Sequence, residues 1–230
     1  MGGEELIAEI DRRIREKSIL KHPFYQDWQS GKLTMPMLQE YAKQYYKHVA
    51  AFPQYLSAVH SKMDNPDDRR LILQNLMDEE HGDKNHPELW IRFGEALGLN
   101  RKEIMDAVAL KETNAFVEHF KLVTSNKSPA VGIAALYAYE SQIPAVSEEK
   151  IKGLACFYGI DSEQGLEYFK VHIQADIEHS AAERELIAKY AAGEETQQQA
   201  LLAVDNTLTA YWTMLSGINE KNHQSIKRAC

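Results

Sequence analysis

The sequence predicts an all-α fold, a single-domain bundle of about eight helices that spans residues 1–230. Apolar residues recur at steps of three and four over long stretches, and no stretch alternates apolar and polar residues as a half-buried strand does. Glycine and proline are scarce, with 12 and 7 residues, and they fall between those stretches. Hydrophobic residues make up 44% and charged residues 26% of the chain, which is the balance of a globular domain.

The N-terminal part is predicted to contain three helices, of which the third is long. The first covers residues 4–18, and a short second helix covers 23–30 and ends at Gly31. Thr34 caps the third helix, which carries Pro36 in its first turn. The inner stripe of this third helix consists of Leu38, Tyr41, Tyr45, His48, Phe52 and Tyr55.

Helical patterns continue to the end of the chain. One helix is expected over about 67–97, bent near Pro87 and ended by Gly98. Asn100 with Glu103 three residues later predicts a capping box that opens another helix. The remaining helices are expected at about 110–125, 128–143, 147–157, 162–191 and 194–222.

The composition argues against several classes of function. A net charge of −8 and a pI near 5.6 disfavour nucleic acid or an anionic membrane as a partner. No run approaches the roughly 18 apolar residues of a membrane span, and the first residues do not have the pattern of a signal peptide. Cys156 and Cys230 form no CxxC motif, and Cys156 is expected to be a small buried residue. We therefore expect a cytoplasmic protein, and a homodimer as its assembly.

Three residues in the segment "HIQADIEHS" share one helix face. His172, Asp176 and His179 follow each other at i, i+4 and i+7, whereas Glu178 lies on another face and is expected to face solvent. Two imidazoles and a carboxylate on one stripe are suitable ligands for a transition metal. A helix face exposed to water could carry the same residues, so a metal site requires further ligands from other segments.

The segment "LMDEEHGDKNHPELW" offers a second set of ligands. Glu79 and His86 are seven residues apart, which places them on one face of the helix expected there. Glu80, His81 and Asp83 lie nearby and compete as ligands, and Asp83 belongs to the same stripe. The alternative interpretation is a solvated acidic face without a metal.

Glu140 is an acidic residue within an otherwise apolar helix, in the segment "ALYAYESQIP". A buried carboxylate is costly unless it is paired, for example with Lys150, or bound to a metal. The candidate metal ligands are therefore Glu79, His86, Glu140, His172, Asp176 and His179. Three carboxylates and three imidazoles suit two iron or manganese ions with open positions for oxygen. The set lacks the repeated Glu-x-x-His motif of ferritin-like bundles.

These motifs resemble a known family. The segment "HPFYQDWQSGKLTMPMLQEYAKQYYKHV" resembles the opening of the haem-oxygenase-like superfamily, which includes thiaminase-type and pyrroloquinoline-quinone-synthase-type proteins. Glu-x6-His, "YAYESQIP" and His-x3-Asp-x2-His resemble the haem-oxygenase-like dimetal oxidases, and among them the family of the Chlamydia protein associating with death domains. The resemblance covers nearly the whole chain and implies a haem-oxygenase-like fold with the six residues above as metal ligands.

The resemblance also implies an activity. Members of that family are associated with forming para-aminobenzoate for folate biosynthesis from one of their own tyrosines, and they are consumed in doing so. The implied cofactors are two transition-metal ions, Fe/Fe or Fe/Mn, with dioxygen and an external reductant from an unknown partner as co-substrates. By position, Tyr25 in "HPFYQDW" would be the tyrosine and Lys150 in "PAVSEEK" the amine donor. Tyr41 and its stripe would guide oxidising equivalents, unless that stripe is ordinary core packing.

Three other functions stay open at this point. A related dimetal oxidase acting on a free amine, amino acid or fatty acid would share the metal ligands and differ only at Tyr25 and Lys150. A thiaminase-like member would instead need a nucleophilic cysteine with an acid/base partner, and Cys156 has none at helical spacing. A cofactor-free oxidase of the same fold would have no use for the six metal-ligand residues. A protein that only binds partners has no use for six metal-ligand residues. The ligand set therefore favours metal-dependent oxygen chemistry.

Overall fold

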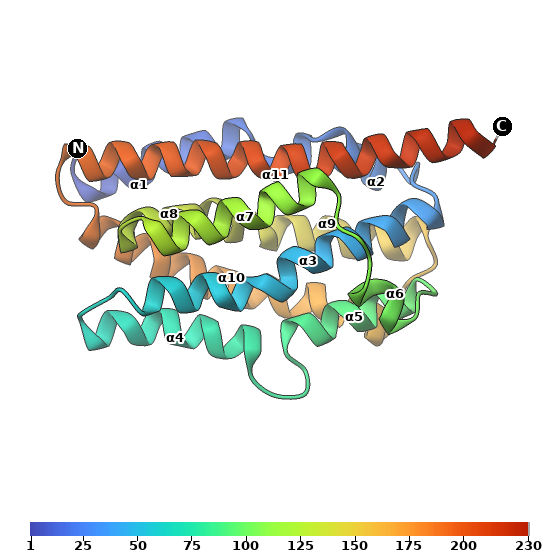
Figure 1. The fold of residues 1–230 in the computed structure, drawn as a ribbon, viewed down its shortest axis with the longest axis horizontal. Helices are drawn as coiled ribbons and strands as arrows, with labels where there is room; N and C mark the ends of the chain where they lie inside the picture. The colour runs from blue at the N-terminus through green and yellow to red at the C-terminus, as the bar shows by residue number, and fades with distance from the viewer. Residues whose placement is uncertain (230) are drawn as a thin grey trace.

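The structure, a computed structural model, describes the backbone of residues 1–229 and the side chains of residues 1–221. Every regular element in these residues is a helix, which confirms the all-α prediction (Figure 1). In chain order the elements are α1 (Gly3–Glu16), the 3-10 helix η1 (Ile19–Lys21), α2 (Pro23–Gln29), α3 (Met35–His60), α4 (Pro66–Glu80), α5 (His86–Ala96), α6 (Arg101–Met105), α7 (Lys111–Asn126), α8 (Pro129–Glu140), α9 (Ile143–Phe157), α10 (Glu163–Tyr190) and α11 (Glu194–Ala229). The described residues therefore form eleven α-helices, more than the bundle of about eight expected and one more than the ten helical ranges predicted individually. Among the described residues, no helix has both the length and the apolar character needed to cross a membrane.

Helices α3 and α10 lie in the middle of the bundle. Figure 1 shows α11 running along one side, beside α1 and α2, with α4 and α5 on the opposite side. Helix α3 packs against α4, α5 and α7, and α10 packs against α4, α5, α8 and α9. The buried apolar residues form one hydrophobic cluster to which all of these helices contribute. Side chains on the inner faces of α3 and α10 can therefore meet those of α4, α5 and α8.

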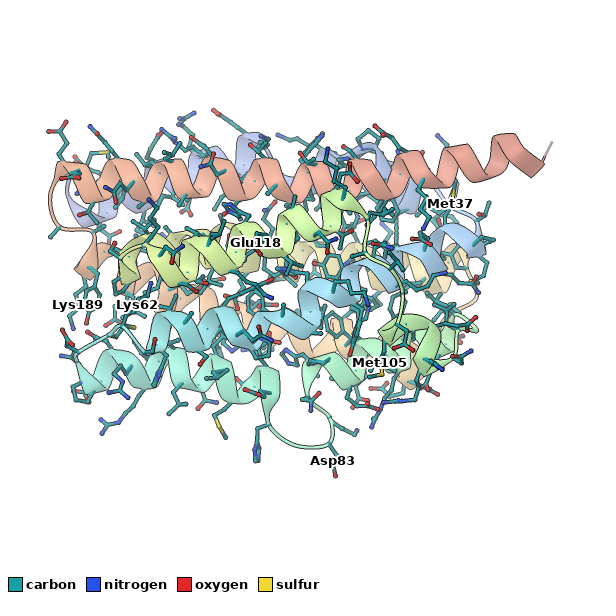
Figure 2. All side chains as sticks on the ribbon, in the orientation of Figure 1. Met37, Lys62, Asp83, Met105, Glu118 and Lys189 are labelled. Carbon is teal, nitrogen blue, oxygen red and sulfur yellow. The ribbon has the colours of Figure 1, made fainter. Side chains whose placement is uncertain are left out.

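The helix expected over 67–97 is two helices, α4 and α5, joined by an exposed loop. Gly82 in this loop has φ of +80°, a conformation that favours glycine and ends the α4 pattern. The side chain of Asn85 then accepts the backbone N–H of Glu88 and caps α5, which has Pro87 in its first turn. Pro87 thus starts a new helix instead of bending an old one. Figure 2 shows Asp83 in this loop, away from the bundle.

Other boundaries agree with or extend the predictions. Asn100 and Glu103 form the expected capping box, because each side chain accepts the backbone N–H of the other residue. Helix α11 continues to Ala229, past the predicted end at residue 222. Cys156 is exposed, so its predicted burial was wrong: it lies on the outer face of α9. Cys230 lies outside the described residues.

Candidate metal centre

The six predicted ligands are all buried and form two groups. Their exposed fractions are 5% or less. One group consists of Glu79, His86 and His172, and the other consists of Glu140, Asp176 and His179. Within each group, one nitrogen or carboxylate oxygen from every residue lies within 4.8 Å of the others, which is close enough for one ion to contact all three.

Helix α10 contributes to both groups. His172, Asp176 and His179 lie on its buried face, as their spacing predicts, and Glu178 is exposed, as expected. His172 joins the two residues from the α4–α5 region, whereas Asp176 and His179 join Glu140 at the end of α8. One helix thus supplies half of the ligand set and connects its two parts.

Glu79 and His86 meet for a reason other than the one predicted. They do not share one helix face, because Glu79 lies near the end of α4 and His86 is the first residue of α5. The loop between the two helices turns the chain back, so that Nδ1 of His86 lies 2.9 Å from Oε1 of Glu79. Asp83 and the other competing ligands of this segment, Glu80 and His81, are exposed.

Several atoms at the centre of this cluster are buried without a hydrogen bond. They are Nδ1 of His86, Nδ1 of His179, Oε2 of Glu140 and Oδ2 of Asp176, none of which makes a hydrogen bond within the described residues. Both imidazole nitrogens nevertheless lie near carboxylate oxygens, those of Glu79 and Glu140. A buried polar atom that makes no hydrogen bond costs about 1–3 kcal/mol. A bound cation would stabilise nitrogen and oxygen atoms that converge in this way, so these residues fit iron or manganese ions well.

Hydrogen bonds around the ligands fix which imidazole nitrogen is free. Nδ1 of His172 donates to the carbonyl oxygen of Tyr168 at 2.6 Å, which leaves the lone pair of Nε2 for a metal. Nε2 of His179 lies 3.1 Å from a carboxylate oxygen of Asp78, so its Nδ1 is the free atom, 3.4 Å from Oε1 of Glu140. Sequence reasoning missed Asp78, because this partner lies on a different helix from His179 and no spacing links the two.

The buried carboxylates of the second group, Glu140 and Asp176, favour a positive charge beside them. Burial opposes protonation of His179, but the Asp176 and Glu140 carboxylates outweigh it and raise the His179 pKa to about 11. Burial and the negative charge of Glu140 raise the pKa of Asp176 to about 7. A proton held on His179 therefore balances the carboxylates here, and a metal ion bound to the same atoms would take over that role.

Glu183 belongs to this environment and was missed by the sequence analysis. It lies on α10 four residues beyond His179 and is only 1% exposed. Burial, followed by the charge of the neighbouring Glu140, raises the pKa of Glu183 well above the ordinary value and so favours its protonated form. Extending the stripe that begins at His172 by one more turn would have found it.

A chain of tyrosine hydroxyls leads from the ligand cluster to Tyr25. The hydroxyl of Tyr139, the residue before Glu140, lies 2.6 Å from that of Tyr45, which lies 3.2 Å from that of Tyr211. The Tyr211 hydroxyl lies 3.4 Å from that of Tyr25, and Tyr25 also contacts the Tyr41 hydroxyl at 3.3 Å. All five side chains are buried. Tyr211, on α11, was not predicted, because nothing in its local sequence separates it from an ordinary core residue.

Lys150 lies in the same aromatic region. It is only 2% exposed, and it does not pair with Glu140, whose carboxylate accepts a hydrogen bond from the side chain of Asn75. Its Nζ lies 5.7 Å from the ring centre of Tyr25 and 5.2 Å from that of Tyr41. Burial lowers the Lys150 pKa to about 7, so a large fraction of its amine is uncharged at neutral pH.

A small cavity adjoins the ligands. Its volume is about 10 Å³, which is room for about one water molecule. Four of the six ligands line it, namely Glu79, Glu140, His172 and Asp176, together with His48, Val49, Phe52, Tyr139 and Tyr168. A molecule in this cavity would lie next to both ligand groups.

Comparisons with known proteins agree with this geometry. A family model described as an iron-containing redox enzyme matches residues 39–212. The chain is 43% identical over 221 residues to a protein of Nitrosomonas europaea named 4-aminobenzoate synthase, covering 92% of this chain and 90% of that one. A protein of Chlamydia pneumoniae with the same name is 42% identical over 207 residues, covering 90% and 92% of the two chains.

The fold is shared more widely. A crystal structure of a domain with a haem-oxygenase-like fold from Shewanella denitrificans superposes with a TM-score of 0.82 at 14% identity, covering 100% of this chain and 97% of that one. Identity at that level shows the fold alone, which confirms the haem-oxygenase-like prediction. By the family match and by its relatives, the chain belongs to the haem-oxygenase-like family of iron-containing redox enzymes, in the group that includes the 4-aminobenzoate synthases of Nitrosomonas and Chlamydia.

Proposed function

We propose that this protein forms 4-aminobenzoate (para-aminobenzoate) for folate biosynthesis from its own Tyr25, with Lys150 as the source of the amino nitrogen. Two ions, Fe/Fe or Fe/Mn, held by the two ligand groups would supply the reduction of dioxygen, with electrons from an external reductant. The names of the relatives support the product. The observation that carries the proposal is the burial of Tyr25 and Lys150 together, at the far end of the hydroxyl chain.

The required chemistry follows from comparing a tyrosine side chain with 4-aminobenzoate. The bond between Cα and Cβ of Tyr25 has to break, Cβ has to be oxidised to a carboxyl carbon, and the phenol oxygen has to be replaced by nitrogen. Dioxygen is the oxidant. The amine of Lys150 can supply the nitrogen, because a nucleophilic amine must be uncharged and burial lowers the Lys150 pKa to about 7. Its transfer requires that the phenol oxygen leaves as water and that the bond between Cε and Nζ of Lys150 breaks.

The hydroxyl chain supports transfer between the metal centre and Tyr25. Tyr139 lines the cavity beside the ligands, and its hydroxyl is connected to that of Tyr25 through Tyr45 and Tyr211. Each tyrosine in the chain can give up a proton to its neighbour when it loses an electron, so oxidising equivalents can move along it. Tyr41 lies beside Tyr25 at the end of the chain and can share the oxidation with it.

The size of the cavity favours Tyr25 over a free organic substrate. An amine, an amino acid or a fatty acid needs several times the volume of about one water molecule that lies beside the ligands. A substrate that is part of the chain needs no such room. The related oxidase acting on free small molecules is therefore the less favoured alternative.

The test uses the protein without any organic substrate. Purified protein is loaded with iron, with and without manganese, and then given dioxygen and a reductant. We expect 4-aminobenzoate to form in at most one equivalent per chain, with a loss of mass on the peptide that carries Tyr25. Tyr25→Phe should abolish the product, whereas Tyr55→Phe, at a buried tyrosine outside the hydroxyl chain, should leave it unchanged. An intact Tyr25 peptide and no product would contradict the proposal.

A further inference from the structure

His48, near the middle of α3, is buried in a place that suits an apolar side chain better. Its exposed fraction is 0%, and neither ring nitrogen has a hydrogen-bond partner among the described residues. The ring centres of its aromatic neighbours lie 4.5 Å away for Phe116, 4.6 Å for Tyr139 and 5.1 Å for Phe120. Leaving a buried polar atom without a partner costs about 1–3 kcal/mol, a cost that phenylalanine would avoid.

The protonation state of His48 is set by this environment. Burial lowers its pKa to about 3, so the imidazole is neutral at physiological pH. A neutral imidazole offers one N–H donor and one lone-pair acceptor. Both capacities are unused within the described part of the chain, which indicates that they serve a molecule other than the protein.

The small cavity shows where such a molecule would lie. His48 lines it together with four metal ligands, among them Glu140 and Asp176. Because the cavity has room for about one water molecule, whatever fills it lies next to the imidazole and the ligands at once. The other lining side chains from α3, Val49 and Phe52, are apolar and offer no hydrogen bond.

We propose that His48 donates a hydrogen bond to the small oxygen ligand, water or dioxygen, that occupies the cavity beside the metal ligands. This inference rests on the proposed metal centre. It gives His48 a role in binding and orienting that ligand, and it explains why a histidine occupies a position surrounded by aromatic side chains. Tyr168, which also lines the cavity, is the competing donor.

The test uses nitric oxide, a diatomic probe of ferrous iron, on iron-loaded protein. Metal content is measured first, then the dissociation constant for nitric oxide and the N–O stretching frequency of the complex. We expect His48→Phe to keep its iron, to bind nitric oxide about tenfold more weakly, a loss of about 1.4 kcal/mol, and to show a higher stretching frequency. His48→Gln, which keeps a donor, should recover most of both effects. Tyr55→Phe, a change at an aromatic neighbour of His48 that does not line the cavity, should leave the frequency unchanged.

The outcomes separate this inference from the proposed function. Wild-type protein that takes up no iron overturns both. If His48→Phe keeps its full iron content and shows an unchanged nitric oxide affinity and N–O stretching frequency, the role of His48 is overturned while the proposed function stands. The same conclusion follows if the frequency shifts in Tyr168→Phe and not in His48→Phe. If His48→Phe does not fold, magnetic resonance on the wild-type nitric oxide complex decides: an exchangeable proton coupled to the bound probe, retained in Tyr168→Phe, supports the role, and its absence overturns it.

Discussion

Replacing Lys150 with methionine should make the protein more stable, and by an amount that depends on pH. The unfolded chain binds a proton at this amine with the ordinary lysine value of 10.5, whereas the folded chain binds it only below a pKa of about 7. Between these two values the unfolded state holds the extra proton, which favours unfolding. At pH 7.4 the difference amounts to about 4 kcal/mol, since each unit of pKa corresponds to about 1.4 kcal/mol.

Methionine has a similar length and no charge, so Lys150→Met removes this penalty while filling the same space. We expect the free energy of unfolding of the variant to exceed that of the wild type by up to about 4 kcal/mol at pH 7.4. Because the stability of the wild type rises with pH through this range, the gap should shrink by about 1.4 kcal/mol per pH unit. Urea unfolding of metal-free protein at pH 7.5, 8.5 and 9.5 measures the gap.

Lys152 provides the matched control, because it lies on the same helix and is exposed. Lys152→Met should change stability by less than about 0.5 kcal/mol, with no dependence on pH over this range. A gap between Lys150→Met and the wild type that stays constant from pH 7.5 to 9.5 would refute the reasoning. A less stable Lys150→Met would do so as well, since it would mean that the amine stabilises the folded core.

Other predictions concern the metal centre and the hydroxyl chain. His172→Ala should lower the bound metal by about half, because one of two ligand groups loses its only residue from α10; unchanged content in elemental analysis would remove this helix from the site. Asp78→Asn should weaken metal binding about tenfold or more in a chelator competition, because the hydrogen bond that orients His179 is weakened. Tyr211→Phe should keep the metal content but reduce 4-aminobenzoate formation at least tenfold, because it interrupts the hydroxyl chain, and Tyr55→Phe should match the wild type in the same assay.

The parts of the site that are local in sequence could be predicted. The period of an α-helix placed His172, Asp176 and His179 on one face, and it could have placed Glu183 there too, since the stripe simply continues. Helical periodicity also predicted correctly that Glu79 and His86 lie together, but for the wrong reason. Their separation of seven residues suggested one helix, but a loop brings them together.

The parts of the site that depend on packing could not be predicted. Nothing near Lys150 in the sequence shows that its amine lies among aromatic rings, because the adjacent glutamates suggest a surface position. The contact of Tyr211 with Tyr25 and Tyr45 arises only when α11 packs across the bundle. The sequence likewise gives no sign that both ring nitrogens of His48 lack a hydrogen-bond partner, because this depends on every residue packed around it.

Helix α10 makes the two ligand groups sensitive to the length of the chain. His172 serves one group and Asp176 the other, four residues and a rise of about 6 Å further along. Deleting one residue between them would turn everything beyond by about 100° and carry Asp176 and His179 away from Glu140. A deletion in the exposed loop between α4 and α5 acts only on the group that contains Glu79 and His86. A single codon lost between His172 and Asp176 would therefore prevent the two halves of the site from forming together, whereas one lost from the loop would spare the half around Glu140.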